Sequence, residues 1–303
     1  MSLVVVGSMA FDSVKTPAGE VKEELGGSAT YFSVSASFFT DVKLVSVIGE
    51  DFGPEYIDLL QKRGIDLEGL ERNVGKTFRW QGEYSDALNE AKTLKTELNV
   101  LEGFHPKLPD AYLHTPYLFL GNIDPVLQSD VLRQVRPKWV ACDTMNFWIQ
   151  GSRNHLLETL REVDIIIVNE AEARLLAREW NLMRAAKMIL ALGPTALVIK
   201  RGEYGALLFH HDKIFSAPAY PLETVIDPTG AGDSFAGGLM GFLAQQDQVN
   251  EKTFRQGVIY GSVMASFCVE AFGLNRILKV TPDDIKNRCA VFRDMTSYED
   301  STA

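Results

Sequence analysis

Cysteine is scarce in this chain of 303 residues. The three cysteines, Cys142, Cys268 and Cys289, are far apart and none belongs to a CxxC pair, which argues against a disulfide framework or a cysteine-based zinc cluster. Long apolar runs are also missing, since none approaches the roughly 20 residues that span a bilayer. The N-terminus has no basic segment before its short apolar run, unlike a signal peptide. These absences predict a cytoplasmic protein without a membrane partner.

Positive charge is in short supply as well. The formal net charge is -10, with 30 Lys and Arg scattered along the chain. A polyanion requires a clustered basic footprint, so nucleic acid is excluded as the main partner. Small phosphorylated molecules stay compatible with this charge, because a local site can be rich in N–H groups inside an acidic protein.

Several catalytic signatures are absent. The sequence contains no HExxH, GxSxG or GxGxxG, and its five histidines show no metal-ligand spacing. Gly75, Lys76 and Thr77 resemble the end of a phosphate-binding P-loop, but five residues separate them from Gly69 where that motif needs four. This stretch is therefore not taken as a P-loop.

Short apolar runs alternate with amphipathic stretches along most of the chain. The strands are expected at 3–6, 43–48, 117–120, 139–142, 164–168 and 196–200, with helices at 28–39, 54–63, 125–135, 154–161, 170–179 and 182–192. A hairpin at 205–215 and helices starting near 229, 251 and 282 follow. Unalternating strands between helices predict an α/β fold, with a doubly wound, mostly parallel sheet and helices on both faces. No linker interrupts the pattern, so residues 1–303 are expected to form one domain.

Two polar stretches interrupt this rhythm, at about 11–25 and 77–101. Both alternate in polarity, which predicts antiparallel strands that project from the main body as a small β lid. Ligands of open parallel sheets lie beyond the carboxyl ends of the strands. Asp12, Asn122, Asp143 and Asn169 all fall near such ends.

The most unusual stretch is DPTGAGD, residues 227–233, before an apolar helix. Helix N-termini offer free N–H groups and bind anions, and glycine lets the backbone approach a phosphate closely. Asp233 beside such an anion hole suits a general base that takes a proton from an alcohol attacking phosphorus. The alternative interpretation is an N-cap with a tight turn, and the residues of the motif alone leave both open.

Four ordered motifs resemble the ribokinase-like (PfkB) family of carbohydrate and nucleoside kinases. They are GGSA at 26–29 with the following stretch 45–66, NEAE at 169–172, IKRGEYGALL at 199–208 and DPTGAGD at 227–233, where Pro228 replaces a commoner threonine. The resemblance spans nearly the whole chain. It implies transfer of the γ-phosphate of ATP, with Mg²⁺, to a hydroxyl of a sugar or nucleoside.

The resemblance also implies site residues on the nucleotide side. Gly230, Ala231 and Gly232 are expected to form the anion hole and Asp233 to be the base. Asn169 and Glu172 are expected to organise Mg²⁺ through water, unless they only cap a helix. The nucleotide contacts are expected from Lys200, Gly202, Gly205 and Thr229, and Asp227 is the candidate ligand of a monovalent cation such as K⁺.

The resemblance implies Asp12, Gly26 and Gly27 as acceptor residues. Further candidates for the acceptor pocket are Tyr31, the lid residue Arg79 and the strand-end residue Asn122. Ser28 and Tyr31 replace the lysine and asparagine of ribokinases, which disfavours ribose bound in the ribokinase manner, and Tyr31 is either a ring-stacking or a core residue. Alternatives left open are a sugar-phosphate kinase, an ADP-dependent kinase and a non-catalytic ligand sensor. The lid is also a candidate homodimer surface.

Overall fold

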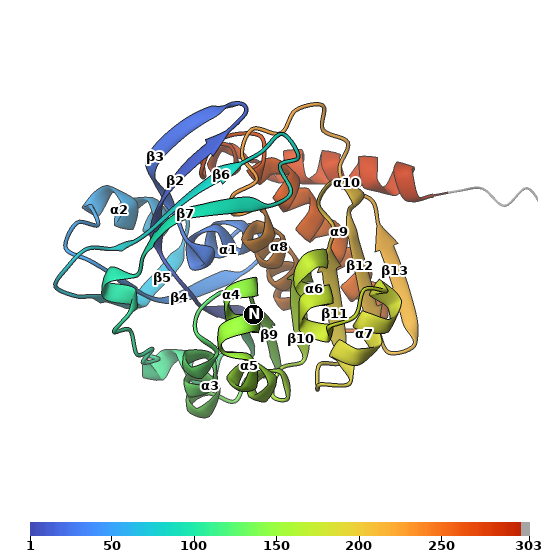
Figure 1. Ribbon diagram of the computed structural model, residues 1–303, viewed down its shortest axis with the longest axis horizontal. Helices are drawn as coiled ribbons and strands as arrows, with labels where there is room; N and C mark the ends of the chain where they lie inside the picture. The colour runs from blue at the N-terminus through green and yellow to red at the C-terminus, as the bar shows by residue number, and fades with distance from the viewer. Residues whose placement is uncertain (298–303) are drawn as a thin grey trace, which may run out of the picture.

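The computed structural model describes residues 1–297 and is built on a nine-stranded sheet in the order β13-β12-β11-β10-β9-β8-β1-β4-β5 (Figure 1). In chain order the strands are β1 (Ser2–Val6), β4 (Asp41–Ile48), β5 (Ile65–Arg72), β8 (Tyr117–Leu120), β9 (Trp139–Asp143), β10 (Ile165–Asn169), β11 (Ala196–Lys200), β12 (Ala206–His210) and β13 (Lys213–Ala217). Pairing is parallel from β5 to β11 and antiparallel for β12 and β13.

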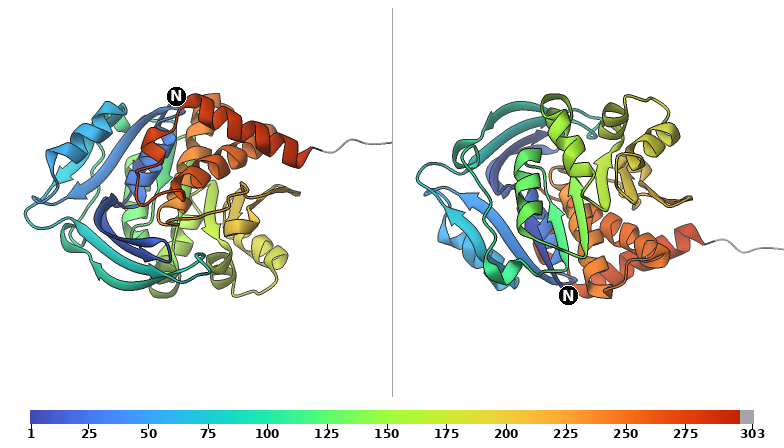
Figure 2. Two further views of the ribbon diagram at one scale, coloured as in Figure 1. Left: turned by 90° about the horizontal axis from the view of Figure 1, so that it is seen from above. Right: turned by 90° about the horizontal axis from the view of Figure 1, so that it is seen from below.

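Helices cover both faces of this sheet, as the three views show together (Figure 2). One layer contains α1 (Ser28–Ala36), α2 (Pro54–Lys62), α8 (Ala231–Gln246), α9 (Glu251–Cys268) and α10 (Pro282–Thr296). The other contains α3 (Pro125–Gln134), α4 (Asn146–Gly151), α5 (Arg153–Leu160), α6 (Glu170–Ala177) and α7 (Leu182–Leu190). In β1, Leu3 and Val5 face the first layer while Val4 and Val6 face the second, which is why the strand is apolar without alternation.

The predicted doubly wound α/β fold is confirmed, with all six predicted parallel strands present and helix ends within three residues. Two elements were not predicted. The edge strand β5 (IDLEGLER) mixes charged and apolar residues, because an edge strand is exposed to water. The helix α4 has only six residues, too few for a periodic pattern. The assignment of the chain to one domain stays a prediction.

A second sheet of four strands, in the order β3-β2-β6-β7, forms the lid. Its strands are β2 (Ala10–Thr16), β3 (Gly19–Gly26), β6 (Phe78–Tyr84) and β7 (Ala91–Glu97). The hairpins β2–β3 and β6–β7 are antiparallel as predicted, but β2 pairs with β6 in parallel, so the expectation of a wholly antiparallel lid is wrong. The reason is topological: β2 follows β1 and β6 follows β5, and these two main-sheet strands run in the same direction.

No helix within residues 1–297 is both long enough and apolar enough to cross a membrane.

Candidate active site

The loop before α8 has the backbone expected of an anion-binding turn. Gly230 takes the N-cap position with φ 75°, and no side chain caps the helix. Its Cα lies on the ring of Tyr31, because a Cβ at this position would overlap the ring atoms. Asp233 lies in the first turn and is not the N-cap, so the N-cap half of the alternative interpretation is wrong, while its tight turn is present at residues 228–231. The Ala231 N–H donates to the Pro228 carbonyl at 3.1 Å, which leaves the N–H groups of Gly230 and Gly232 for a ligand.

Asp233 is close to the ammonium group of Lys200. Burial raises the pKa of Asp233 to about 6, and the positive charge of Lys200 opposes this rise. The Lys200 Nζ lies against the anion loop, 2.6 Å from the position that a Cβ would take on Gly232. A carboxylate with this pKa is ionised at neutral pH and still basic enough to accept a proton.

Two more carboxylates share this environment, Asp143 at the end of β9 and Glu172 in the first turn of α6. Burial raises the pKa of both groups, Asp233 raises it further, and Lys200 lowers it. One oxygen of Asp143, Oδ1, is buried without a hydrogen-bond partner. Three carboxylates around one ammonium leave an excess of negative charge, which fits a site for a cation.

Asn169 and Glu172 form a reciprocal capping box on α6. The Glu172 N–H donates to Asn169 Oδ1 and the Asn169 N–H donates to Glu172 Oε2, both at 2.8 Å. The helix-capping interpretation is therefore confirmed. Each residue keeps a further polar atom for a ligand, so the cap and the predicted metal role are compatible.

The predicted nucleotide turn follows β11. Gly202 and Gly205 have φ of 55° and 84°, a region that favours glycine. A Cβ on Gly205 would overlap the Ala217 carbonyl oxygen, and one on Gly202 would overlap Asn89 Oδ1. Asn89 belongs to the loop between β6 and β7, so the tip of the lid touches the predicted nucleotide turn. No local sequence pattern predicts this contact.

On the acceptor side, Asp12 lies within β2 and is 6% exposed, so it is not a residue of a surface turn. Its carboxylate takes the space that a side chain on Gly26 would need, and Oδ2 accepts a 3.4 Å hydrogen bond from the Gly27 N–H. Burial raises the pKa of Asp12 to about 7, the Gly27 N–H lowers it, and Asp233 and Asp227 raise it. Asp12 thus lies within electrostatic range of the proposed base.

Three predicted acceptor residues are already engaged by protein groups. Tyr31 is a core residue, 2% exposed, beneath Gly230. Asn122 accepts from Trp148 Nε1 at 2.9 Å and its Nδ2 lies 3.1 Å from Met145 Sδ. Arg79 donates to Glu23 and Asp51, each at 2.8 Å. Tyr31 therefore supports the anion loop from beneath, and the acceptor roles of Asn122 and Arg79 stay predictions.

Asp227 organises the anion loop. Its Oδ1 accepts from the Thr229 N–H at 2.9 Å and its Oδ2 from the Gly273 N–H at 3.3 Å. The thiol of Cys268, which the sequence did not single out, donates to the Thr229 carbonyl at 3.4 Å. The predicted monovalent-cation role of Asp227 stays a prediction.

Tyr84 joins the lid to this loop. Its hydroxyl lies 3.4 Å from Thr229 Oγ1. We expect Tyr84→Phe to raise the KM for the acceptor about 2- to 10-fold, because one hydrogen bond contributes about 0.5–1.5 kcal/mol. Steady-state kinetics measure this effect, with Tyr117→Phe as the matched control, because the hydroxyl of Tyr117, the first residue of β8, also makes one long hydrogen bond, to Asp247 Oδ1 at 3.5 Å. If the acceptor KM of Tyr84→Phe equalled that of the wild type, the hydrogen bond between Tyr84 and Thr229 would not help to hold the lid over the site.

Comparison with known proteins agrees with this geometry. Residues 137–280 match the pfkB family carbohydrate kinase model. The cytidine kinase of Thermococcus kodakarensis is 31% identical over 79% of this chain and 87% of its own length, and fructokinase-2 of Oryza sativa is 24% identical over 90% and 87%. The structure of the Methanocaldococcus jannaschii nucleoside kinase superposes with a TM-score of 0.76 at 20% identity, over 96% of this chain and 98% of that one.

The family model includes the anion loop, the capping box and the nucleotide turn. Together with the relative at 31% identity it confirms the resemblance found in the sequence. The chain belongs to the pfkB family of carbohydrate kinases and is a small-molecule kinase with the ribokinase-like fold.

Proposed function

We propose that this kinase transfers the γ-phosphate of ATP to a hydroxyl of a nucleoside, with Asp233 as the general base. The observation that supports this most is the position of Asp233, in the uncapped first turn of α8 beside Lys200 and within electrostatic range of Asp12. A carboxylate next to free N–H groups suits a reaction in which the oxygen of an alcohol attacks the γ-phosphorus, its proton passes to the carboxylate, and the N–H groups stabilise the negative charge on the transferred phosphoryl group. The similarity to a cytidine kinase favours a nucleoside over a hexose.

Each residue has one task in the proposed mechanism. Asp12 accepts hydrogen bonds from acceptor hydroxyls and orients the attacking one toward Asp233. Asp233 removes its proton as the new O–P bond forms and the bond between the γ-phosphorus and the β–γ bridging oxygen breaks, which releases ADP. The anion loop at 230–232, through the N–H groups of Gly230 and Gly232, and the Lys200 ammonium stabilise the negative charge on the transferred phosphoryl group.

Mg²⁺, when bound, neutralises charge on the nucleotide phosphates. Asp143, Glu172 and Asn169 would hold it, and the unpartnered buried Asp143 oxygen fits this role. Within residues 1–297 no group of three His, Cys, Asp or Glu side chains is arranged to bind a metal directly. The carboxylates would therefore bind Mg²⁺ largely through its water shell, which this ion retains readily.

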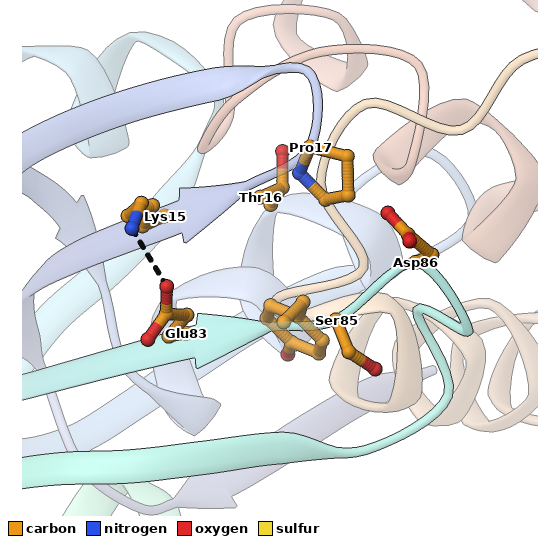
Figure 3. Close-up of a pocket in the computed structure, with 7 residues that line it drawn as sticks. Lys15, Thr16, Pro17, Glu83, Ser85 and Asp86 are labelled. Carbon is orange, nitrogen blue, oxygen red and sulfur yellow. Dashed lines mark hydrogen bonds and ion pairs between the residues drawn. The ribbon is translucent and has the colours of Figure 1, made fainter.

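The basic residues near the acceptor side favour an uncharged acceptor over a sugar phosphate. Arg79 is bound by two carboxylates, and Lys95 pairs with Glu97 at 2.9 Å. Lys15 pairs with Glu83 at 2.7 Å, and both residues line a pocket of about 280 Å³ (Figure 3). Lys43 donates to the Ala111 carbonyl. A phosphate on the acceptor would have to displace one of these partners.

An ADP-release assay tests the proposed function. Cytidine, other nucleosides, fructose, ribose and their phosphates are each offered with Mg-ATP and, separately, with Mg-ADP as the donor. We expect turnover with ATP and at least one nucleoside. ATP binding without turnover on any acceptor would instead favour a ligand sensor, and turnover confined to phosphorylated acceptors would favour the sugar-phosphate alternative.

The rate should depend on the ionisation of Asp233. Below its pKa of about 6 the base is protonated, so we expect kcat/KM to fall about tenfold per pH unit on the acid side. Lys200→Met removes the charge that lowers this pKa, and the acid limb should move to higher pH. The pH profile of kcat/KM measures both effects. If the acid limb of Lys200→Met lay at the same pH as that of the wild type, Lys200 would not lower the pKa of the catalytic base.

A further inference from the structure

The inward face of the lid is defined by strand alternation. Tyr84 on β6 reaches Thr229 in the anion loop, and Trp80 and Gly82 lie on the same face because side chains of a strand alternate. Across the parallel pairing, Trp80 lies opposite Asp12 and Gly82 opposite Val14. Trp80 is therefore the strand neighbour of Asp12, and the two side chains lie on the same face of the lid.

Gly82 explains how the indole is positioned. A Cβ on this residue would overlap the benzene ring of Trp80, so the indole lies in the space that a side chain at 82 would fill. Gly82 is not among the residues with positive φ, so its backbone conformation does not require glycine. Glycine inside a strand is unfavourable by about 0.5–1 kcal/mol relative to alanine. The room for the indole is the gain that offsets this cost.

The indole is also fixed in orientation and open to a ligand. Its Nε1 donates to Thr93 Oγ1 on β7 at 3.2 Å, which anchors one edge of the ring. Trp80 is only partly buried, unlike the core aromatic residues Tyr31 and Phe32. A partly exposed, oriented indole beside the acceptor carboxylate is a surface on which a planar ring can stack.

We propose that Trp80, held over Gly82, stacks on the heterocyclic base of a nucleoside acceptor and selects it over a simple sugar. This inference rests on the proposed function and specifies its substrate class. Asp12 would bind the sugar hydroxyls and Trp80 the base, so these two adjacent residues would together recognise both parts of one nucleoside. The lid would then act as a specificity element in addition to covering the reacting groups.

Steady-state kinetics of Trp80→Leu test the proposal, with cytidine and ribose as the two probes. Stacking on an aromatic residue contributes about 1–3 kcal/mol per base, so the KM for cytidine should rise about 5- to 100-fold. We expect the KM for ATP, and any turnover on ribose, to stay unchanged. Gly82→Ala should reproduce this effect by displacing the indole. Trp80→Phe, which keeps a stacking ring, should keep cytidine KM within a few-fold. Trp180→Leu is the control, because Trp180 is 81% exposed.

Tryptophan fluorescence gives a readout that needs no turnover. Cytidine should quench emission in the wild type and in Trp180→Leu, and this quench should be lost in Trp80→Phe. An unchanged cytidine KM in Trp80→Leu, or an equal rise for ribose, would overturn the proposal. If cytidine quenched the emission of Trp80 but was not phosphorylated, the stacking proposal would stand and the proposed phosphorylation of a nucleoside would be contradicted. Phosphorylation of ribose alone, unaffected by Trp80→Leu, would overturn it and leave the kinase reaction standing.

Discussion

Asp233→Asn is expected to lower kcat about 10²- to 10⁴-fold, the contribution of a positioned general base. The amide has nearly the same shape as the carboxylate but cannot accept the proton of the attacking hydroxyl. Asp233 is partly buried beside Lys200, so removing its charge also relieves desolvation, and the folded protein should be at least as stable as the wild type near neutral pH. Stopped or coupled ADP-release assays measure kcat, and equilibrium binding should show ATP affinity largely retained.

The matched control for this variant is Asp283→Asn. Asp283 also lies in the first turn of a helix, α10, but it is exposed and far along the chain from the site. The charge change is identical, so kcat should equal that of the wild type. A kcat for Asp233→Asn within about threefold of the wild type would show that another group is the base.

Gly230→Ala is expected to lower kcat/KM at least about 100-fold, because a displacement near 1 Å at a reacting group has an effect of this size. Two physical effects add at this position. A φ of 75° is unfavourable for alanine by about 1–2 kcal/mol, and the new Cβ would overlap the Tyr31 ring. Overpacking of this kind destabilises by about 1–3 kcal/mol. Thermal unfolding should show a lowered Tm.

Gly64→Ala separates the two effects. Gly64 has nearly the same φ, 74°, and a Cβ there would meet no atom within 4 Å. This control should show the backbone strain alone, with a small loss of stability and unchanged kinetics. If Gly230→Ala behaved like Gly64→Ala in both measurements, the close contact between the anion loop and Tyr31 would have no catalytic consequence.

The main sheet could be predicted from the sequence because its strands are buried on both faces. Runs such as LVVV in β1 and IIIV in β10 are wholly apolar over four residues. Such a run is too short for a helix and too apolar for a surface loop, and it is typical of a strand buried on both faces. The anion loop was less readable from its own residues, since glycine at 230 and an acid at 233 also fit an N-cap with a tight turn, and the resemblance to the kinase family decided between the two. The strand pattern reports the local solvent environment, which sequence records directly.

The lid was harder because its geometry depends on residues distant in the chain. The parallel pairing of β2 with β6 follows from where β1 and β5 end, and no local pattern records that. Arg79 was predicted to contact the acceptor, but the structure places Glu23 and Asp51 against its guanidinium. A free cation and a paired cation look the same in sequence. The sequence likewise shows that an aromatic residue and a glycine stand at 80 and 82, but not that the indole of Trp80 lies over Gly82.

The central claim is that this fold moves a phosphoryl group onto a nucleoside hydroxyl with Asp233 as the base. The most direct measurement is mass spectrometry of the products from cytidine and Mg-ATP, quantified together with ADP for the wild type and Asp233→Asn. We predict one phosphorylated nucleoside per ADP in the wild type and almost none in the variant. ADP without a phosphorylated acceptor, or equal product from both proteins, would contradict the account.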